Sequence, residues 1–146
     1  MIIQRSRNYI YTTAAPPALA VAIGKSIEIV QEGQELRSHL QSLIRYFQKG
    51  VSRLPFASAE ARPDQFLQFS SDTPIQPVVL GDNDLAVRAA ALLRNRGLLV
   101  VAIRPPTVPV NTARLRISLS AAHSRADVDV LLEAMYEVFC QLGVCQ

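Results

Sequence analysis

Residues 98–120, LLVVAIRPPTVPVNTARLRISLS, contain the pattern that decides the fold. The first six residues are all apolar, which predicts a buried strand. The three prolines within residues 104–109 exclude regular structure there, because proline fixes φ and donates no hydrogen bond. In residues 114–120 apolar and polar side chains alternate strictly, which predicts a strand with one buried face. The stretch therefore predicts two strands joined by a stiffened loop.

Helical patterns surround these two strands. Apolar side chains recur at helical spacing in four segments, residues 19–30, 36–47, 85–93 and 125–142. A further strand is expected at residues 75–80, and a short one at residues 66–70. The order of these segments predicts an α+β fold, in which a small, mainly antiparallel sheet has its helices packed on one face.

The overall composition excludes several classes of protein. The net charge is +3, but the basic residues are scattered among carboxylates instead of forming a stripe, which disfavours a nucleic-acid binder. No apolar run approaches the ~20 residues that a membrane-spanning helix needs, so no membrane partner is expected. Cys140 and Cys145 have no metal-ligand spacing and form no disulfide framework, so we expect a cytoplasmic protein without a metal site.

Arg104 is the strongest candidate for a binding residue. It follows a predicted strand and precedes two prolines, so its backbone is expected to be fixed. A guanidinium held in this way presents a planar fork of donors that suits a carboxylate. A surface arginine beside a proline turn would have the same sequence, and the residues alone leave both interpretations open. The chain shows no phosphate loop, zinc signature or nucleophile–histidine–acid arrangement, so no catalytic residue is expected in it.

Three segments, in order, resemble the 8-amino-7-oxononanoate synthases. They are NYIYTTAAPP at residues 8–17, SDTPIQP at residues 71–77 with Gly81 and Asp82, and AIRPPTVPVNTARLRISLSAAH at residues 102–123. The resemblance extends over essentially the whole chain and is weakest at residues 51–68. Glycine C-acetyltransferase, 5-aminolevulinate synthase and serine palmitoyltransferase share the fold, but their versions of the arginine loop differ.

The resemblance implies an acyltransferase of fold type I that depends on pyridoxal phosphate and works as a homodimer in biotin synthesis. Such enzymes join a pimeloyl thioester to L-alanine and release 8-amino-7-oxononanoate, CO2 and the thiol carrier. Residues 1–146 would correspond to the C-terminal small domain, with a leading segment and first helix at residues 1–33 and a compact α+β part at residues 34–146. The large cofactor-binding domain, with its Schiff-base lysine, would be absent.

Two consequences and two alternatives follow from this resemblance. The chain alone is expected to be inactive, and its first helix is expected to be poorly buried because it would lack its neighbours. One alternative is a stand-alone interaction module that reuses the domain. The other is a part of a sister enzyme such as glycine C-acetyltransferase.

The resemblance also implies roles for individual residues. Arg104 would pair with the substrate carboxylate, and Thr107 would contact the substrate from the same loop. Thr12 and Thr13 match a segment that reaches the cofactor phosphate of the partner subunit, although they could instead cap the first helix. The family usually has glycine where Asn111 stands, and asparagine tolerates a left-handed backbone well, so the turn is expected to survive.

The remaining candidate residues are expected to have structural roles. Lys25 and Lys49 are the chain's two lysines, and neither matches the position of the Schiff-base lysine. Arg114 and Arg116 alternate on a strand and are expected to form structural ion pairs. His123 is expected to be a turn or cap residue.

Overall fold

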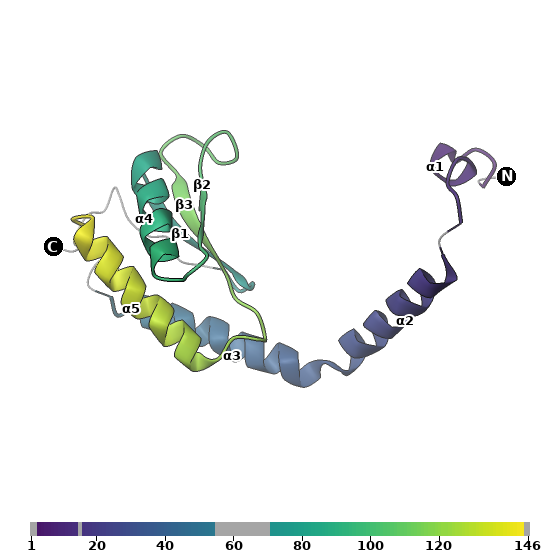
Figure 1. The fold of residues 1–146 in the computed structure, drawn as a ribbon, viewed down its shortest axis with the longest axis horizontal. Helices are drawn as coiled ribbons and strands as arrows, with labels where there is room; N and C mark the ends of the chain where they lie inside the picture. Colours follow the sequence, from purple (N-terminus) through teal and green to yellow (C-terminus); the bar gives the residue numbers. More distant parts are fainter. Residues whose placement is uncertain (1–2, 15, 55–70, 145–146) are drawn as a thin grey trace. The chain divides into compact units, whose positions relative to one another are not determined.

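The computed structural model describes residues 3–14, 16–54 and 71–144, shown as a ribbon in Figure 1. The chain divides into two compact units, Met1–Glu35 and Leu36–Gln146. The short strand predicted at residues 66–70 lies outside the described residues.

The first unit contains two helices, α1 (Arg7–Ile10) and α2 (Pro17–Glu32). The sequence predicted α2, because Pro17 occupies the first helical position and Gly33 ends the helix. The single turn of α1 was not predicted, since four residues are too few to show a periodic pattern. Neither helix contains a buried residue.

The second unit consists of three helices around a sheet. The helices are α3 (Gln34–Val51), α4 (Asn83–Asn95) and α5 (Arg125–Gln141). Asp82 caps α4 by accepting a 2.7 Å hydrogen bond from the backbone N–H of Leu85. Ser124 and Asp127 form a reciprocal capping box at the start of α5.

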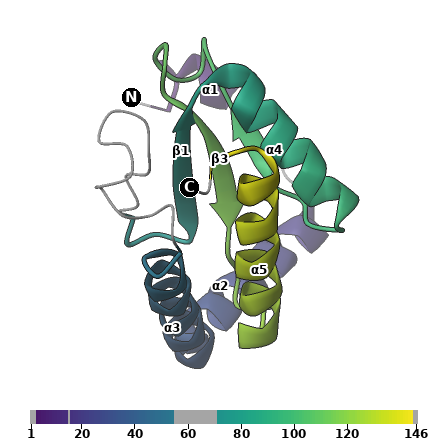
Figure 2. The ribbon, with the colours of Figure 1, turned by 90° about the vertical axis from the view of Figure 1, so that its left-hand side faces the viewer.

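The sheet has three antiparallel strands in the order β1-β3-β2, where β1 is Ile75–Gly81, β2 is Val101–Ile103 and β3 is Ala113–Ser118. Alternate residues of β1 and β3 are buried, so one face of the sheet belongs to the core. Figure 2 shows α4 and α5 in front of the sheet. The predicted α+β fold, with a small antiparallel sheet and helices, is confirmed.

The strand predicted at residues 98–103 is shorter than expected and lies at an edge of the sheet. Only Val101–Ile103 pair with β3. The backbone N–H of Leu98 donates instead to the carbonyl of Leu93, which closes the end of α4 and turns the chain before it can join the sheet. Leu99 is 76% exposed. The prediction of a six-residue buried strand was therefore wrong, because a purely apolar run carries no signal for where pairing begins.

The core lies entirely in the second unit. It joins α3, α4 and α5 to the buried face of the sheet, and its largest fully buried side chains are Phe47, Phe139, Leu43, Ile44, Leu93, Leu115 and Met135. Gly50 of α3 lies against Leu132 of α5, where a Cβ atom would collide with a methyl group of the leucine side chain.

Polar contacts add to the packing of α3 against α5. The hydroxyl of Tyr46 donates to Oδ1 of Asp129 over 2.7 Å, and the guanidinium of Arg125 lies 5.5 Å from the centre of the Tyr46 ring. The hydrogen bond to Asp129 raises the pKa of Tyr46 above its ordinary value. These contacts hold α3 against α5.

Candidate functional site

The loop that follows β2 begins with a tight turn. The backbone N–H of Thr107 donates to the carbonyl of Arg104 over 3.1 Å, and the peptide bond between Pro105 and Pro106 is cis. Arg104 is the first residue after Ile103, which is paired with Arg114 of β3. The backbone of Arg104 is therefore fixed by the strand on one side and by two proline rings on the other.

The rest of the loop is held by its own hydrogen bonds. Both the N–H and the hydroxyl of Thr112 bond to the carbonyl of Pro109, at 3.3 and 2.8 Å. Asn111 has a φ of 63°, so the expectation that asparagine adopts the left-handed backbone at this turn is confirmed. The carbonyl of Asn111 lies close to Gly81, where a Cβ atom would be 3.5 Å from it.

The side chains of Arg104 and Thr107 are both exposed. Within residues 3–14, 16–54 and 71–144, no hydrogen bond or ion pair engages the guanidinium of Arg104. The structure thus presents this guanidinium on a fixed backbone, away from any described carboxylate. That is the arrangement a carboxylate-binding arginine requires.

Thr12 and Thr13 lie in the first unit, separate from the unit that carries the arginine loop. Both are exposed, and the hydroxyl of Thr12 donates to the backbone carbonyl of Asn8. Neither threonine caps α2, because the residue at its N-cap is Pro16 and no side chain bonds to that end. The alternative that these threonines cap the first helix was therefore wrong.

Arg114 and Arg116 of β3, and His123 beyond the end of that strand, were expected to have structural roles. Nε of Arg114 donates to the carbonyl of Thr112 over 3.0 Å, and the described residues include no ion pair of Arg114 or Arg116. The expected structural ion pairs are thus not seen in the part of the chain that the structure describes. Nδ1 of His123 accepts from the backbone N–H of Ser120 over 3.1 Å, so the prediction of a turn residue is confirmed.

A pocket of about 300 Å³ lies elsewhere in the second unit. It is lined by the segment 97–100 after α4, the end of β3 and the first turns of α5. Its lining is mainly apolar, and its polar members include His123 and Asp127. The two hydrogen bonds from the N–H and hydroxyl of Ser124 lower the pKa of Asp127. Neither Arg104 nor Thr107 lines this pocket, so the structure does not bring it together with the predicted substrate site.

The lysines do not suit a covalent bond to pyridoxal phosphate. Nζ of Lys25 pairs with Glu28 over 2.9 Å on the surface of α2, and that side chain is 66% exposed. Lys49 is also exposed, near the end of α3. A lysine that forms an imine is normally desolvated so that it can lose its proton, and neither lysine is.

The helix N-termini of the second unit do not suit the cofactor phosphate either. A helix N-terminus binds phosphate through free N–H groups and its dipole. Here the first turn of α3 carries Glu35, α4 is capped by Asp82, and the first turn of α5 carries Asp127, which forms a capping box with Ser124. Each of these ends already has a carboxylate. These three helix N-termini therefore do not offer a phosphate site.

The sequence analysis did not identify Gln76, a residue that holds the segment before β1 in place. Gln76 is fully buried, and its Nε2 donates to the carbonyls of Ser71 and Thr73 over 2.7 and 2.6 Å. Nε2 of Gln48 in α3 donates to the same Ser71 carbonyl over 2.8 Å. Gln76 thereby fixes the segment before β1. Its position could have been predicted, because it shares its strand parity with the buried Val78 and Leu80.

The comparisons with known proteins agree with the motifs. The model of the family described as aminotransferase class I and II matches residues 1–135. The 8-amino-7-oxononanoate synthase of Pseudomonas putida KT2440 is 50% identical over 141 residues, which are 97% of this chain and 34% of the relative. That of Marinobacter nauticus is 49% identical over 92% of this chain and 32% of its own length. The predicted resemblance is confirmed, and the chain spans about a third of the length of these relatives.

Solved structures give the same result at the level of the fold. The serine palmitoyltransferase of Sphingomonas wittichii matches 98% of this chain and 34% of its own, with a TM-score of 0.80 and 26% identity. The 8-amino-7-oxononanoate synthase of Francisella tularensis matches 96% of this chain and 38% of its own, with a TM-score of 0.72 and 26% identity.

Proposed function

This chain belongs to the aminotransferase class I and II family, and from that membership we propose that it is part of a pyridoxal-phosphate-dependent acyltransferase of the 8-amino-7-oxononanoate synthase type. The reaction joins a pimeloyl thioester to L-alanine and releases 8-amino-7-oxononanoate, CO2 and the free thiol carrier. The protein would act in the cytoplasm. Within the fold, residues 1–146 would form the C-terminal small domain, with the first helix in residues 1–33 and the α+β part in residues 34–146.

The observation that carries the proposal is the turn at residues 104–107. It holds the backbone of Arg104 while its guanidinium remains exposed and unengaged by any described residue. We assign to Arg104 the two-point binding of the amino-acid carboxylate, which holds the substrate in one orientation. Thr107 would contact the same substrate, because the turn keeps it beside Arg104.

The cofactor would be held mainly by the part of the family's fold that lies outside this chain, including the Schiff-base lysine. Pyridoxal phosphate supplies the electron sink for such chemistry when it is bound. In a homodimer, a threonine of this chain would reach the partner subunit's cofactor phosphate. Thr12 and Thr13 are the two candidates, and both are exposed.

The substrate could instead be that of a sister enzyme. The fold similarity to serine palmitoyltransferase, with a TM-score of 0.80, is at least as high as that to the Francisella synthase. The sequence identity of 50% with the Pseudomonas synthase favours L-alanine and pimeloyl thioester. Comparing turnover with L-alanine, L-serine and glycine in one assay distinguishes the synthase from a sister enzyme.

The test is complementation in two chains. This chain is co-expressed with the remaining two thirds of the Pseudomonas putida relative, and CO2 release is measured with pimeloyl thioester and each amino acid. We expect turnover with L-alanine when both chains are present and none with either chain alone. Turnover by this chain alone would contradict the proposal, as would preference for glycine or serine.

A further inference from the structure

The last residues of helix α5 lead into a turn that redirects the chain. The backbone N–H of Gly143 donates to the carbonyl of Cys140 over 3.0 Å, and that of Val144 donates to the carbonyl of Phe139 over 2.8 Å. Gly143 has a φ of 74°, in the left-handed region that favours glycine. These features define a Schellman motif, which holds the residues that follow a helix against its last turn.

This turn bears on the chain's two cysteines. Cys140 lies in the last turn of α5, and Cys145, the only other cysteine, directly follows Val144. Neighbouring Cα atoms are about 3.8 Å apart, so a residue after Val144 stays close to the helix turn that binds Val144. Cys140 is disulfide-bonded, and the sequence offers only Cys145 as its partner. The spacing of the cysteines did not predict this bond, because it depends on the turn at Gly143.

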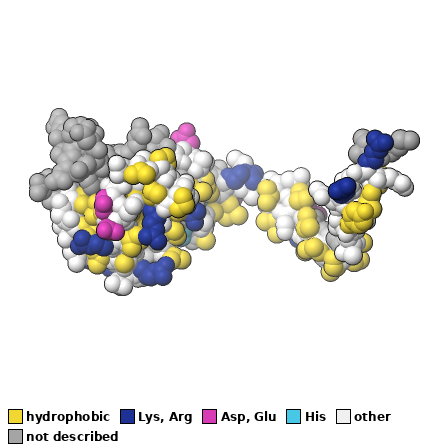
Figure 3. All heavy atoms as spheres, turned by 90° about the horizontal axis from the view of Figure 1, so that it is seen from above, with side chains coloured by type: hydrophobic (Ala, Val, Ile, Leu, Met, Phe, Trp, Pro, Cys, Tyr) yellow, Lys and Arg dark blue, Asp and Glu magenta, His cyan; other side chains and the backbone are white. Residues whose placement is uncertain are grey.

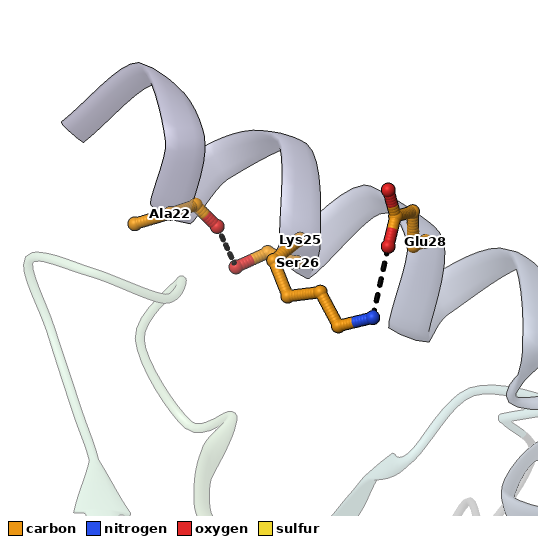
Figure 4. Close-up of polar contacts among 4 residues, drawn as sticks. All are labelled: Ala22, Lys25, Ser26 and Glu28. Carbon is orange, nitrogen blue, oxygen red and sulfur yellow. Dashed lines mark hydrogen bonds and ion pairs between the residues drawn. The ribbon is translucent and has the colours of Figure 1, made fainter. Parts of the chain in front are cut away.

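The bond of Cys140 differs in kind from the local contacts of the other helices. In α2, Nζ of Lys25 lies 2.9 Å from Oε2 of Glu28, and the hydroxyl of Ser26 donates to the carbonyl of Ala22 over 2.9 Å (Figure 4). Contacts of this type do not depend on the redox conditions, whereas a disulfide forms and breaks by exchange with other thiols and disulfides. The end of α5 can therefore have two covalent states.

The surroundings of Cys140 favour exchange with another disulfide over reaction with a peroxide. Cysteines that react with peroxides have nearby cations that stabilise the thiolate. The last turn of α5 contains no basic residue, and it forms the negative end of the helix dipole. On the face that it presents, Figure 3 shows the Lys and Arg side chains of the second unit, in dark blue, dispersed among hydrophobic ones. A disulfide that closes so short a loop also gains little from loop entropy, which makes it easier to reduce.

We propose that Cys140 and Cys145 are a reversible redox site that exchanges with small-molecule disulfides such as oxidised glutathione. One protein thiolate attacks a sulfur of the small disulfide and releases a small thiolate. The other protein thiolate then attacks the cysteine sulfur of the mixed disulfide and releases a second one. Two protein thiols and one small disulfide thus become one protein disulfide and two small thiols, which take up the two protons. The inference goes beyond the proposed function and does not depend on it.

The test uses the full chain, reduced and then equilibrated with mixtures of reduced and oxidised glutathione. Free thiols are alkylated and counted by intact mass. As oxidised glutathione increases, we expect the chain to pass from two alkyl groups to none while it stays monomeric. Excess reduced glutathione should restore both thiols without denaturant. Cys140→Ser and Cys145→Ser should each form only a mixed disulfide with one glutathione.

Gly143→Ala tests the turn. Alanine is strained in the left-handed region, and the reduced chain can leave the turn to avoid this strain, whereas the oxidised chain cannot. The substitution should therefore lower the equilibrium constant for disulfide formation at least about threefold. Gly97→Ala is the matched control, because Gly97 has a φ of 82° and the N–H of Leu98 donates to the carbonyl of Leu93, the same motif at the end of α4. A Cβ atom has open space at both glycines, and we expect less than about a 1.5-fold change for the control.

Circular dichroism establishes that each variant keeps its helix content. Two alkyl groups in every glutathione mixture, or a disulfide between two copies of the chain, would overturn the proposal. A bond that reduced glutathione cannot open would also overturn it, because the site would not be reversible. Faster oxidation by hydrogen peroxide than by an equal concentration of oxidised glutathione would refute the assigned exchange partner. Equal effects of Gly143→Ala and Gly97→Ala would refute the role of the turn.

Discussion

Arg104 combines a fixed backbone with a guanidinium that no described residue engages. In the complemented enzyme, Arg104→Ala should lower kcat/KM for L-alanine about 100-fold, since hydrogen bonds to charged groups contribute roughly 1.5–3 kcal/mol and each 1.4 kcal/mol is tenfold. Arg104→Lys should recover only part of this, because an ammonium cannot bind a carboxylate in two places. Steady-state kinetics measure both values.

The matched control for Arg104 is Arg116→Ala. Arg116 is also an exposed arginine, but it lies on β3, where it pairs in register with Val101. We expect its loss to change kcat/KM by less than about twofold. Equal losses in the two variants would mean that net positive charge, and not a positioned guanidinium, matters.

Gln76 illustrates the opposite case, a polar side chain fully withdrawn from water and bonded to two carbonyls. Gln76→Leu should lower the free energy of unfolding by about 1–3 kcal/mol, because both hydrogen bonds from its Nε2, to the carbonyls of Ser71 and Thr73, are lost. Urea denaturation measures the change. The exposed Gln41 on α3 is the control, and Gln41→Leu should change stability by less than about 0.5 kcal/mol. A similar effect of both substitutions would refute the role of burial.

At the scale of the elements, the sequence predicted the helices and strands whose apolar side chains recur with a regular period. The alternation in residues 114–120 gave β3 and its buried face, and Pro17 with Gly33 gave α2. The sequence did not predict α1 or the true start of β2, because a single turn and a purely apolar run contain no period. For the site, it identified the loop that presents Arg104. Gln76 was missed because a polar residue in a strand suggests exposure, although its parity with Val78 and Leu80 places it on the buried face.

The start of α5 provides a pH-dependent prediction. Hydrogen bonds from the N–H and the hydroxyl of Ser124 hold the pKa of Asp127 below its ordinary value. A carboxylate whose pKa is lower in the folded state stabilises the fold above its unfolded pKa of about 3.9, and this contribution is lost as the pH falls through the folded value. The stability difference between the unsubstituted chain and Asp127→Ala should therefore shrink as the pH falls from about 5 to 3.

Urea denaturation at a series of pH values checks this expectation. Ser124→Ala removes the hydroxyl but keeps the N–H, so its variant should retain part of the pH dependence. If the difference between the unsubstituted chain and Asp127→Ala stayed constant from pH 5 to 3, the carboxylate would not be acting through its ionised form.

At the scale of the whole molecule, the two units differ in what stabilises them. Every residue of the core cluster lies between Leu43 and Phe139, and no described residue of the first 35 is buried. The resemblance implied one small domain, with a leading segment and first helix at residues 1–33 and a compact α+β part at residues 34–146. A unit that contains no fully buried side chain contributes little to cooperative unfolding, since apolar burial is the main favourable term.

Deleting residues 1–35 should therefore leave the second unit folded, with its free energy of unfolding changed by less than about 1 kcal/mol. Urea denaturation measures the change. If the truncated chain unfolded, the claim that the second unit is stable by itself would be wrong. Its core would then depend on residues 1–35, which contribute none of its buried side chains.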